Sequence, residues 1–200
     1  PTSDEKGIFF LKGKKNLPVC NMDYKNKGFV SNLNHKQMLL LVQEISKQTG
    51  IEYCLPSFQS IYEEFYGYWK MPDKEFKKML EDYFINSSEI LLREGKIIFW
   101  KGVVMEVEGE LKYDGESVDV EINDFDDILE VLSKPDLFKR KRCTCGRFTD
   151  YPIKRDPFRW FDKDERNVRS TWSNVENCLY MTAISTDYGN NHHVVALKKF

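Results

Sequence analysis

The chain is poor in alanine and has no long hydrophobic run. Only two alanines, Ala183 and Ala196, occur among its 200 residues, whereas lysine, asparagine, isoleucine and phenylalanine are common. Such a composition is typical of AT-rich genomes, which occur in viruses, phages, low-GC bacteria and protists. No stretch of eighteen apolar residues occurs, so the sequence predicts no membrane-spanning helix. Residues 1–17 also lack the hydrophobic run of a signal peptide, and we expect a cytoplasmic protein.

Cysteine is sparse and scattered, which disfavours a disulfide framework. The five cysteines are an odd number, typical of reduced thiols in a cytoplasmic protein. Cys143 and Cys145 form half of a possible zinc site, because Zn²⁺ takes four tetrahedral ligands and close thiolates suit it. We predict that both are reduced and metal-free and that the protein has no cofactor. In the zinc alternative, the remaining ligands come from Cys20, Cys54, Cys178, His192 or His193.

The formal net charge of −2 hides two segments of opposite sign. From Lys134 to Arg169 there are twelve basic and six acidic residues, a net charge of +6, and seven of the eight arginines lie there. From Val104 to Glu130 there are eleven acids and one base, a net charge of −10. The two segments either neutralise each other within the fold or serve separate partners.

The arginine-rich stretch Phe138–Phe161 interleaves arginines with aromatic residues. A guanidinium group donates hydrogen bonds to phosphate in a fork and also stacks on flat rings. This pattern favours nucleic-acid binding, or binding of a partner protein, through a long loop. The candidate binding residues are Arg140, Arg142, Arg147, Arg155, Arg159 and Trp160, together with Lys74, Lys77 and Lys78.

The first half of the chain predicts helices and a hairpin. Asn34–Gln48 begins with a capping box of Asn34 and Gln37 and stops at Gly50. Further segments are expected in the following order: a strand at Gly7–Leu11, a loop at Leu17–Ser31, a short strand at Ile51–Leu55, a helix from Ser57, a helix at Asp73–Ile85, and a hairpin formed by Glu89–Arg93 and Lys96–Val104.

This order, over Asn34 to about Gly102, resembles a winged helix-turn-helix. The resemblance implies that the helix at Asp73–Ile85 faces a DNA major groove, with Lys74, Lys77 and Lys78 near phosphates. The alternative is a helical module with a solvated lysine face, because Glu75, Glu81 and Asp82 lie on the same helix.

The second half predicts strands. Val103–Ile122 alternates apolar and acidic residues, which predicts that the carboxylates of Glu106, Glu108, Asp119 and Glu121 are exposed or paired with the arginine-rich segment. Asp114-Gly115 predicts a turn between two strands. A short helix is expected at Asp124–Leu132, and a C-terminal hairpin from Asn177–Thr186 and His192–Phe200.

Three patterns point to an enzyme as a further alternative. Asn177-Cys178-Leu179-Tyr180 resembles the nucleophile region of some cysteine proteases, and His193-Val194-Val195-Ala196 resembles their histidine strand. Fourteen residues separate Cys178 from His192, so a hairpin would place them at opposite ends. Pro72-Asp73 with Glu110-Leu111-Lys112 resembles the loose motif of metal-dependent nucleases.

The sequence therefore predicts an α+β protein with a winged-helix-like region at 1–102 and a β-rich region at 103–200, or one continuous domain. We expect a non-enzymatic nucleic-acid-binding or regulatory protein. The first alternative is a viral or phage-type protein that binds and inhibits a host protein. The second is a cysteine-dependent or metal-dependent hydrolase.

Overall fold

The computed structural model describes residues 7–13, 21–23, 28–66, 74–92, 97–119, 153–155 and 165–199. At 21–23, 97–102, 116–119 and 154–155 it describes the backbone only. Helices and sheets are both present, so the α+β class is confirmed. The helices of the described part are α2 (His35–Thr49), α3 (Phe58–Tyr66) and α4 (Lys74–Asp82).

Most strands join one nine-stranded sheet, in the order β2-β3-β11-β5-β9-β10-β8, with β6 pairing with β5 and β7 pairing with β6. Two pairings are parallel, β11 with β5 and β10 with β8. The strands are β2 (Asn21–Asp23), β3 (Phe29–Ser31), β5 (Phe84–Leu92), β6 (Ile97–Val107), β7 (Glu110–Asp119), β8 (Ile153–Arg155), β9 (Glu165–Ser173), β10 (Cys178–Ser185) and β11 (His193–Val194).

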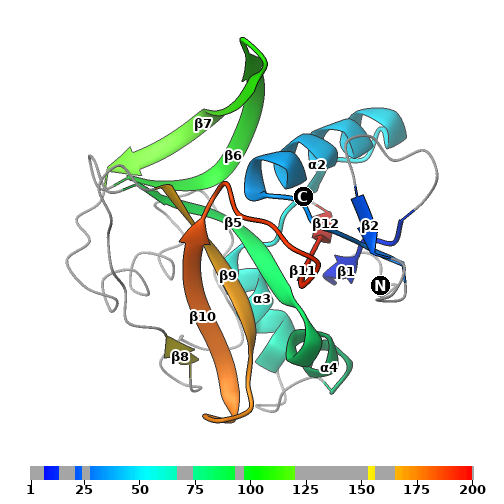
Figure 1. Ribbon diagram of the computed structural model, residues 1–200, viewed down its shortest axis with the longest axis vertical. Helices are drawn as coiled ribbons and strands as arrows, with labels where there is room; N and C mark the ends of the chain where they lie inside the picture. The colour runs from blue at the N-terminus through cyan, green and yellow to red at the C-terminus, as the bar shows by residue number, and fades with distance from the viewer. Residues whose placement is uncertain are drawn as a thin grey trace.

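A second, three-stranded sheet has the order β1-β12-β4. Its strands are β1 (Phe9–Phe10), β12 (Ala196–Lys199) and β4 (Tyr53–Cys54). The chain passes directly from β11 in the large sheet to β12 in the small one. The C-terminal segment therefore connects the two sheets, which lie side by side in Figure 1.

Helix α2 forms as the sequence predicts. The Asn34 side chain accepts from the Gln37 N–H, the Gln37 side chain accepts from the Asn34 N–H, and Gly50 ends the helix in the left-handed region at φ 70°. These contacts satisfy backbone groups that a helix end leaves unpaired. The buried face of α2 includes Met38, Leu41, Val42 and Ile45, as expected from their spacing.

Helices α3 and α4 both pack against the large sheet, α3 on β5 and β9 and α4 on β9, and α3 lies behind these strands in Figure 1. Their aromatic residues pack against Val168, Leu179 and Met181 in the main core, and Phe58, Ile61, Tyr62 and Phe65 are all fully buried. A second core lies beneath α2 and includes Val104 and Leu197.

The predicted boundaries of two segments are wrong. Residues 17–31, expected as a loop, contain β2 and β3. The helix expected at Asp73–Ile85 ends at Asp82, because Phe84 and Ile85 pair with β11 in the sheet. The hairpin expected from residues 89–104 is confirmed, with Ile90 opposite Phe99 in β5 and β6.

The turn between β6 and β7 lies six residues earlier than predicted. Glu108 and Gly109 occupy it with φ values of 52° and 81°, and Val107 pairs with Glu110 across it. Positive φ at both central residues is the type I′ geometry that matches the strand twist. Asp114 and Gly115, the predicted turn, lie inside β7 opposite Val103 and Gly102.

The predicted C-terminal hairpin is also wrong in its pairing. β10 pairs with β9 through a turn at residues 174–177, whereas β11 pairs with β3 and β5. Residues 153–155 of the arginine-rich stretch, expected as a loop, form β8. Hydrophobic alternation identifies strands, but it does not identify their partners.

Strands from both predicted regions pair in the large sheet, and Gly102 lies inside β6. The winged-helix resemblance and the division at residue 102 stay predictions. The helix expected at Asp124–Leu132 lies outside the described residues.

Candidate functional site

The three predicted lysines lie on α4 but differ in their surroundings. Lys74 and Lys78 are exposed, whereas Lys77 is partly buried. The Lys77 ammonium lies 4.5 Å from the centre of the Trp172 ring and 3.9 Å from a carboxylate oxygen of Glu81. Lys77 therefore helps to pack α4 on β9, and of the three lysines Lys74 and Lys78 are the exposed ones.

Most of the arginine-rich stretch lies outside the described residues. This applies to Arg140, Arg142, Arg147, Arg159, Trp160 and the possible zinc ligands Cys143 and Cys145. Arg155 is described by its backbone alone, as the last residue of β8. Within the described ranges, no group of three or more His, Cys, Asp or Glu residues lies together in a way that could hold a metal ion.

Arg169, on β9, is the arginine of the predicted segment with the most detailed surroundings. Its guanidinium lies over the Phe84 ring at 4.0 Å, and its Nε donates to Thr182 Oγ1 at 2.7 Å. Its Nη1 lies 2.7 Å from His193 Nε2. Because a guanidinium only donates, His193 Nε2 must accept, and the imidazole proton sits on Nδ1, which donates to Asn190 Oδ1.

These contacts indicate that the His193 side chain stabilises the fold. Burial, the Arg169 charge and the neighbouring His192 together lower the pKa of His193 to about 4. Cys178 is buried and pairs with Ser173, whereas the β10 residue of this cluster is Thr182, which accepts from Arg169. Four positions of β10 therefore separate the thiol from this cluster, about 13 Å along a strand. The described structure does not form the cysteine protease pair.

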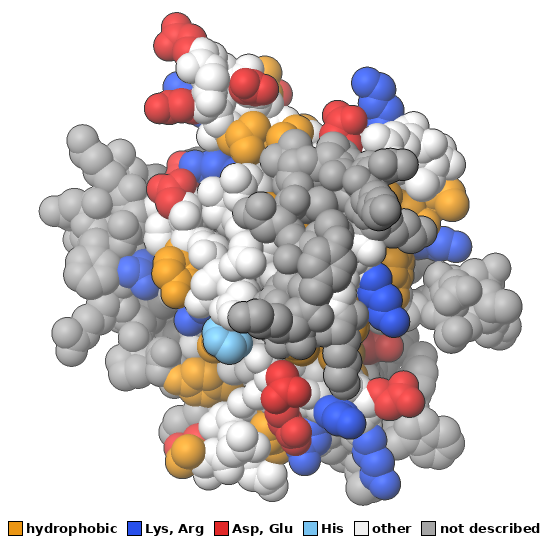
Figure 2. Space-filling model, turned by 45° about the vertical axis from the view of Figure 1, so that its right-hand side comes forward, with side chains coloured by type: hydrophobic (Ala, Val, Ile, Leu, Met, Phe, Trp, Pro, Cys, Tyr) orange, Lys and Arg blue, Asp and Glu red, His pale blue; other side chains and the backbone are white. Residues whose placement is uncertain are grey.

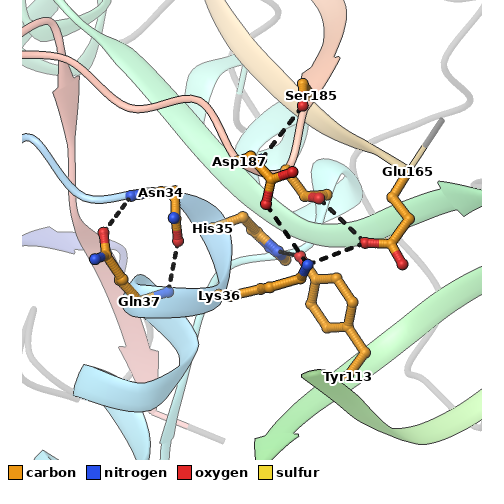
Figure 3. A network of polar contacts seen from close by, with 9 residues as sticks. Asn34, His35, Lys36, Gln37, Tyr113, Glu165, Ser185 and Asp187 are labelled. Carbon is orange, nitrogen blue, oxygen red and sulfur yellow. Dashed lines mark hydrogen bonds and ion pairs between the residues drawn. The ribbon is translucent and has the colours of Figure 1, made fainter. Parts of the chain in front are cut away.

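A second polar network joins the start of α2 to β7 and β5 (Figure 3). His35 is fully buried, with Nε2 2.9 Å from the Ser87 carbonyl oxygen and Nδ1 2.8 Å from the Tyr113 hydroxyl. Since a carbonyl only accepts, Nε2 donates to Ser87 and Nδ1 accepts from Tyr113. Burial lowers the pKa of His35 to about 4, although the Ser87 carbonyl raises it, and burial raises the pKa of Tyr113.

Lys36 extends this network to two carboxylates. Its ammonium lies 3.3 Å from Glu165 Oε2 and 3.7 Å from Asp187 Oδ1, and Thr186 Oγ1 donates to the same Glu165 oxygen. An open groove of about 490 Å³ borders this site. Its lining residues are Asn34, Lys36, Gln37, Gly109, Glu110, Leu111 and Asp187.

The polar run at residues 86–89 of β5 is buried beside these networks. Between Asn86 and Ile90 the register with β9 shifts, which marks a bulge. The Asn167 side chain stabilises this bulge, because its Oδ1 accepts from Asn86 Nδ2 and its Nδ2 donates to the Ser87 and Glu89 carbonyls. The Glu89 carboxylate accepts from the Phe58 N–H at the start of α3, where the helix dipole favours negative charge.

The sequence did not single out His35, Tyr113 or Asn167 as a network. The available signal was the run Asn86-Ser87-Ser88-Glu89, four polar residues between the apolar parts of one strand. A buried strand with such a run requires partners for each polar group. We interpret His35, Tyr113 and Asn167 as scaffold, because their side chains hydrogen-bond to other parts of the fold.

The β6–β7 hairpin presents a different kind of surface. It rises from the top of the molecule, and acidic side chains gather on the protruding end (Figure 2). Val103 and Met105 are 42% and 47% exposed, and these two residues alternate along one side of β6. The residues paired with them, Asp114 and Lys112, are also exposed. We call residues 103, 105, 110, 112 and 114 the outer face.

The predicted exposure of the acidic block is confirmed where it is described. Glu106 and Glu108 are exposed, although Glu108 lies in the turn rather than on a strand face. The side chain of Asp119 and all of Glu121 lie outside the described part. Glu110 and Lys112 of the nuclease-like motif lie on the hairpin, and Asp73 is not among the described residues.

Comparison of the chain with protein-family models, with curated proteins and with solved structures gave no match. Among the described helices, none has the length and apolar character needed to span a membrane.

Proposed function

We propose that this protein is a non-enzymatic binding protein that recognises a basic partner protein through the outer face of the β6–β7 hairpin. The observation that carries the proposal is the exposure of Val103 and Met105 among exposed carboxylates on a protruding element. Methionine is enriched at protein interfaces and adapts to irregular surfaces. The surrounding acids raise the rate at which a basic partner arrives.

A regulatory role fits this surface, including inhibition of a host protein by a viral or phage protein. Cys54 and Cys178 are in no disulfide, which fits a reducing compartment. The neutral, hydrogen-bonded state of both His35 and His193 supports binding over acid–base catalysis, since neither ring has a free nitrogen for a substrate.

Site-specific photo-crosslinking tests the proposal. A photoreactive amino acid replaces Met105 in one protein and Val175 in a control, since Val175 is 93% exposed at the β9–β10 turn. We expect position 105, and not position 175, to give a crosslinked species that protease removes and nuclease does not. Met105→Lys should reduce this crosslinking from a probe at position 103, whereas Val175→Lys should not. Equal crosslinking from both positions, or none, would contradict the proposal.

The second candidate is nucleic-acid binding by the arginine-rich stretch, with Lys74 and Lys78 on α4. The exposure of these two lysines favours it, and the winged-helix resemblance gives α4 the role of recognition helix. The exposed acids Glu75, Glu81 and Asp82 on the same helix weaken the attraction of α4 to phosphate.

Fluorescence anisotropy with labelled single-stranded and duplex oligonucleotides tests this candidate. Affinity should fall with salt with a logarithmic slope of about −0.7 to −0.9 per phosphate contact. The double variant Arg140→Glu with Arg142→Glu should weaken binding to every sequence. Trp160→Ala should cost about 1–3 kcal/mol on single strands if a base stacks there. Absence of binding at low salt excludes the candidate.

A further inference from the structure

The hairpin has two edges, and the fold covers only one of them with described residues. On the β6 side, the Gln43 side chain of α2 bonds the outward backbone groups of Val104. With the amide oxygen and nitrogen of Gln43 exchanged, the amide donates to the Val104 carbonyl at 3.2 Å and accepts from the Val104 N–H at 3.0 Å. On its other edge, away from β6, β7 pairs with no described strand, and it is the outermost strand of the hairpin in Figure 1.

The register identifies which backbone groups point away from β6. Val107 and Glu110 flank a two-residue turn and therefore form a hydrogen-bonded pair. In an antiparallel ladder such pairs alternate, so Glu106 and Leu111 form the next pair, whose N–H and C=O groups point outward. The same alternation places the Val104 groups outward, where Gln43 is found. The Leu111 N–H and C=O thus face the open side of β7.

Strand β7 contributes Glu110 and Leu111 to the lining of the groove of about 490 Å³, and the loop after β10 contributes Asp187. Glu110 is exposed, and the Asp187 side chain is 81% exposed. Lys36, the basic residue of the lining, already contacts Glu165 and Asp187. Acids therefore outnumber bases in and next to the groove.

We infer that the outer edge of β7 binds an extended basic segment of the partner protein as an added strand, with one lysine or arginine side chain in the groove. This inference rests on the proposed protein-binding function and specifies its mode. In strand addition the main-chain hydrogen bonds give affinity, and pockets for alternate side chains give specificity. The occupant is basic because the groove, the exposed hairpin and the whole segment 104–130, with its net charge of −10, are acidic.

A synthetic peptide tests this mode directly. The probe is a fluorescein-labelled peptide of alternating lysine and valine, as long as the 10-residue β7. A matched probe carries N-methyl groups on every second residue, on the backbone edge that would face β7, and keeps the same charge. We expect the first probe to bind in fluorescence anisotropy and the N-methylated probe to bind at least about tenfold more weakly, because main-chain hydrogen bonds are lost.

Two variants of one residue separate backbone from side-chain effects. Leu111→Pro removes the outward N–H without removing a hydrogen bond to β6, whereas Leu111→Ala keeps the N–H and shortens the side chain. Leu111→Pro should weaken binding of the peptide about tenfold and Leu111→Ala less than about threefold. Circular dichroism checks that both variants fold. Equal binding of the two variants, or of the two probes, overturns strand addition.

Other occupants of the edge give distinct results. If the wild-type protein sediments as a dimer and Leu111→Pro as a monomer, the edge belongs to a second copy of this chain. If Arg140→Glu with Arg142→Glu makes the peptide bind more tightly, the basic segment of the same chain occupies the edge. Either result overturns the assignment to a partner protein. A peptide that fails to bind while Met105 crosslinking persists overturns the added strand and leaves the proposed function standing.

Discussion

Strands β5 and β6 are neighbours in sequence and in the sheet, yet they use polar residues in opposite ways. In β5, the run Asn86–Glu89 is buried, and its hydrogen bonds are made inside the molecule. In the hairpin that β6 begins, Glu106 and the outer-face residues face solvent. A buried polar group costs free energy unless it is bonded, so the fold determines the partners of β5. The exposed side chains of the hairpin carry no such constraint and remain available for recognition.

The residues that stabilise the fold also differ from those that we propose bind a partner. His35 and Arg169 each contact two or more elements, and Asn167 bonds the buried polar run of β5, so their removal should unfold or loosen the sheet. Val103 and Met105 contribute little to the fold because nearly half of each side chain is in water. The following variants disturb one or the other of these two groups of residues, and the first should have the greatest effect.

Asn167→Ala should give the greatest loss of stability. The Asn167 side chain accepts one hydrogen bond and donates two, all to buried groups in the bulge of β5. Each buried group left without a partner costs about 1–3 kcal/mol, so we expect a loss of about 4 kcal/mol in the free energy of unfolding. Urea denaturation measures it. The control is Gln48→Ala, an exposed amide on α2, which should change stability by less than about 0.5 kcal/mol. Similar effects from both variants would remove the distinction between buried and exposed polar residues.

Acid should destabilise the protein through the buried histidines. Burial lowers the pKa of His35 from 6.5 to about 4, so between these values the unfolded chain binds a proton that the folded chain does not. Stability is therefore greatest above pH 6.5 and falls as pH drops toward 4, by about 3 kcal/mol for His35. Thermal melts at several pH values measure the slope. Because the pKa of His193 is lowered in the same window, His35→Gln should flatten the slope by roughly half and not abolish it.

Local signals in the sequence predicted the helices well and the sheet partners poorly. The capping box of Asn34 and Gln37 and the stop at Gly50 lie within one helix, and all three are as expected. The pairing of β11 with β5 joins residues that are more than a hundred positions apart. Apolar alternation does not encode such a choice, so a hairpin between β10 and β11 was the simplest prediction, and it was wrong.

The same limit applied to the candidate site. The exposed lysines of α4 and the acidic hairpin were visible as charge patterns, and Glu106 and Glu108 are exposed as predicted. The roles of His35 and Tyr113 depend on a contact between residues 78 positions apart. The turn at Glu108-Gly109 was missed because Asp114-Gly115 matches the usual turn signal more closely, although both pairs end in glycine.

Gly109→Ala should have the smallest effect, confined to the hairpin. Gly109 has φ 81°, which L residues rarely adopt, but a Cβ there would have no heavy atom within 4 Å. The cost is therefore one of backbone conformation alone, about 1 kcal/mol. Since the tip of the hairpin stands apart from the core, hydrogen exchange should rise in β6 and β7 while the amides of β9 and β10 keep their protection. Gly189→Ala is the matched contrast, because a Cβ at Gly189 would overlap the backbone oxygen of Leu33 just before α2. We expect that variant to increase exchange across α2 and the large sheet. If Gly109→Ala also loosens β9 and β10, the hairpin is part of the cooperative core, and its outer face can no longer be treated as independent of the fold.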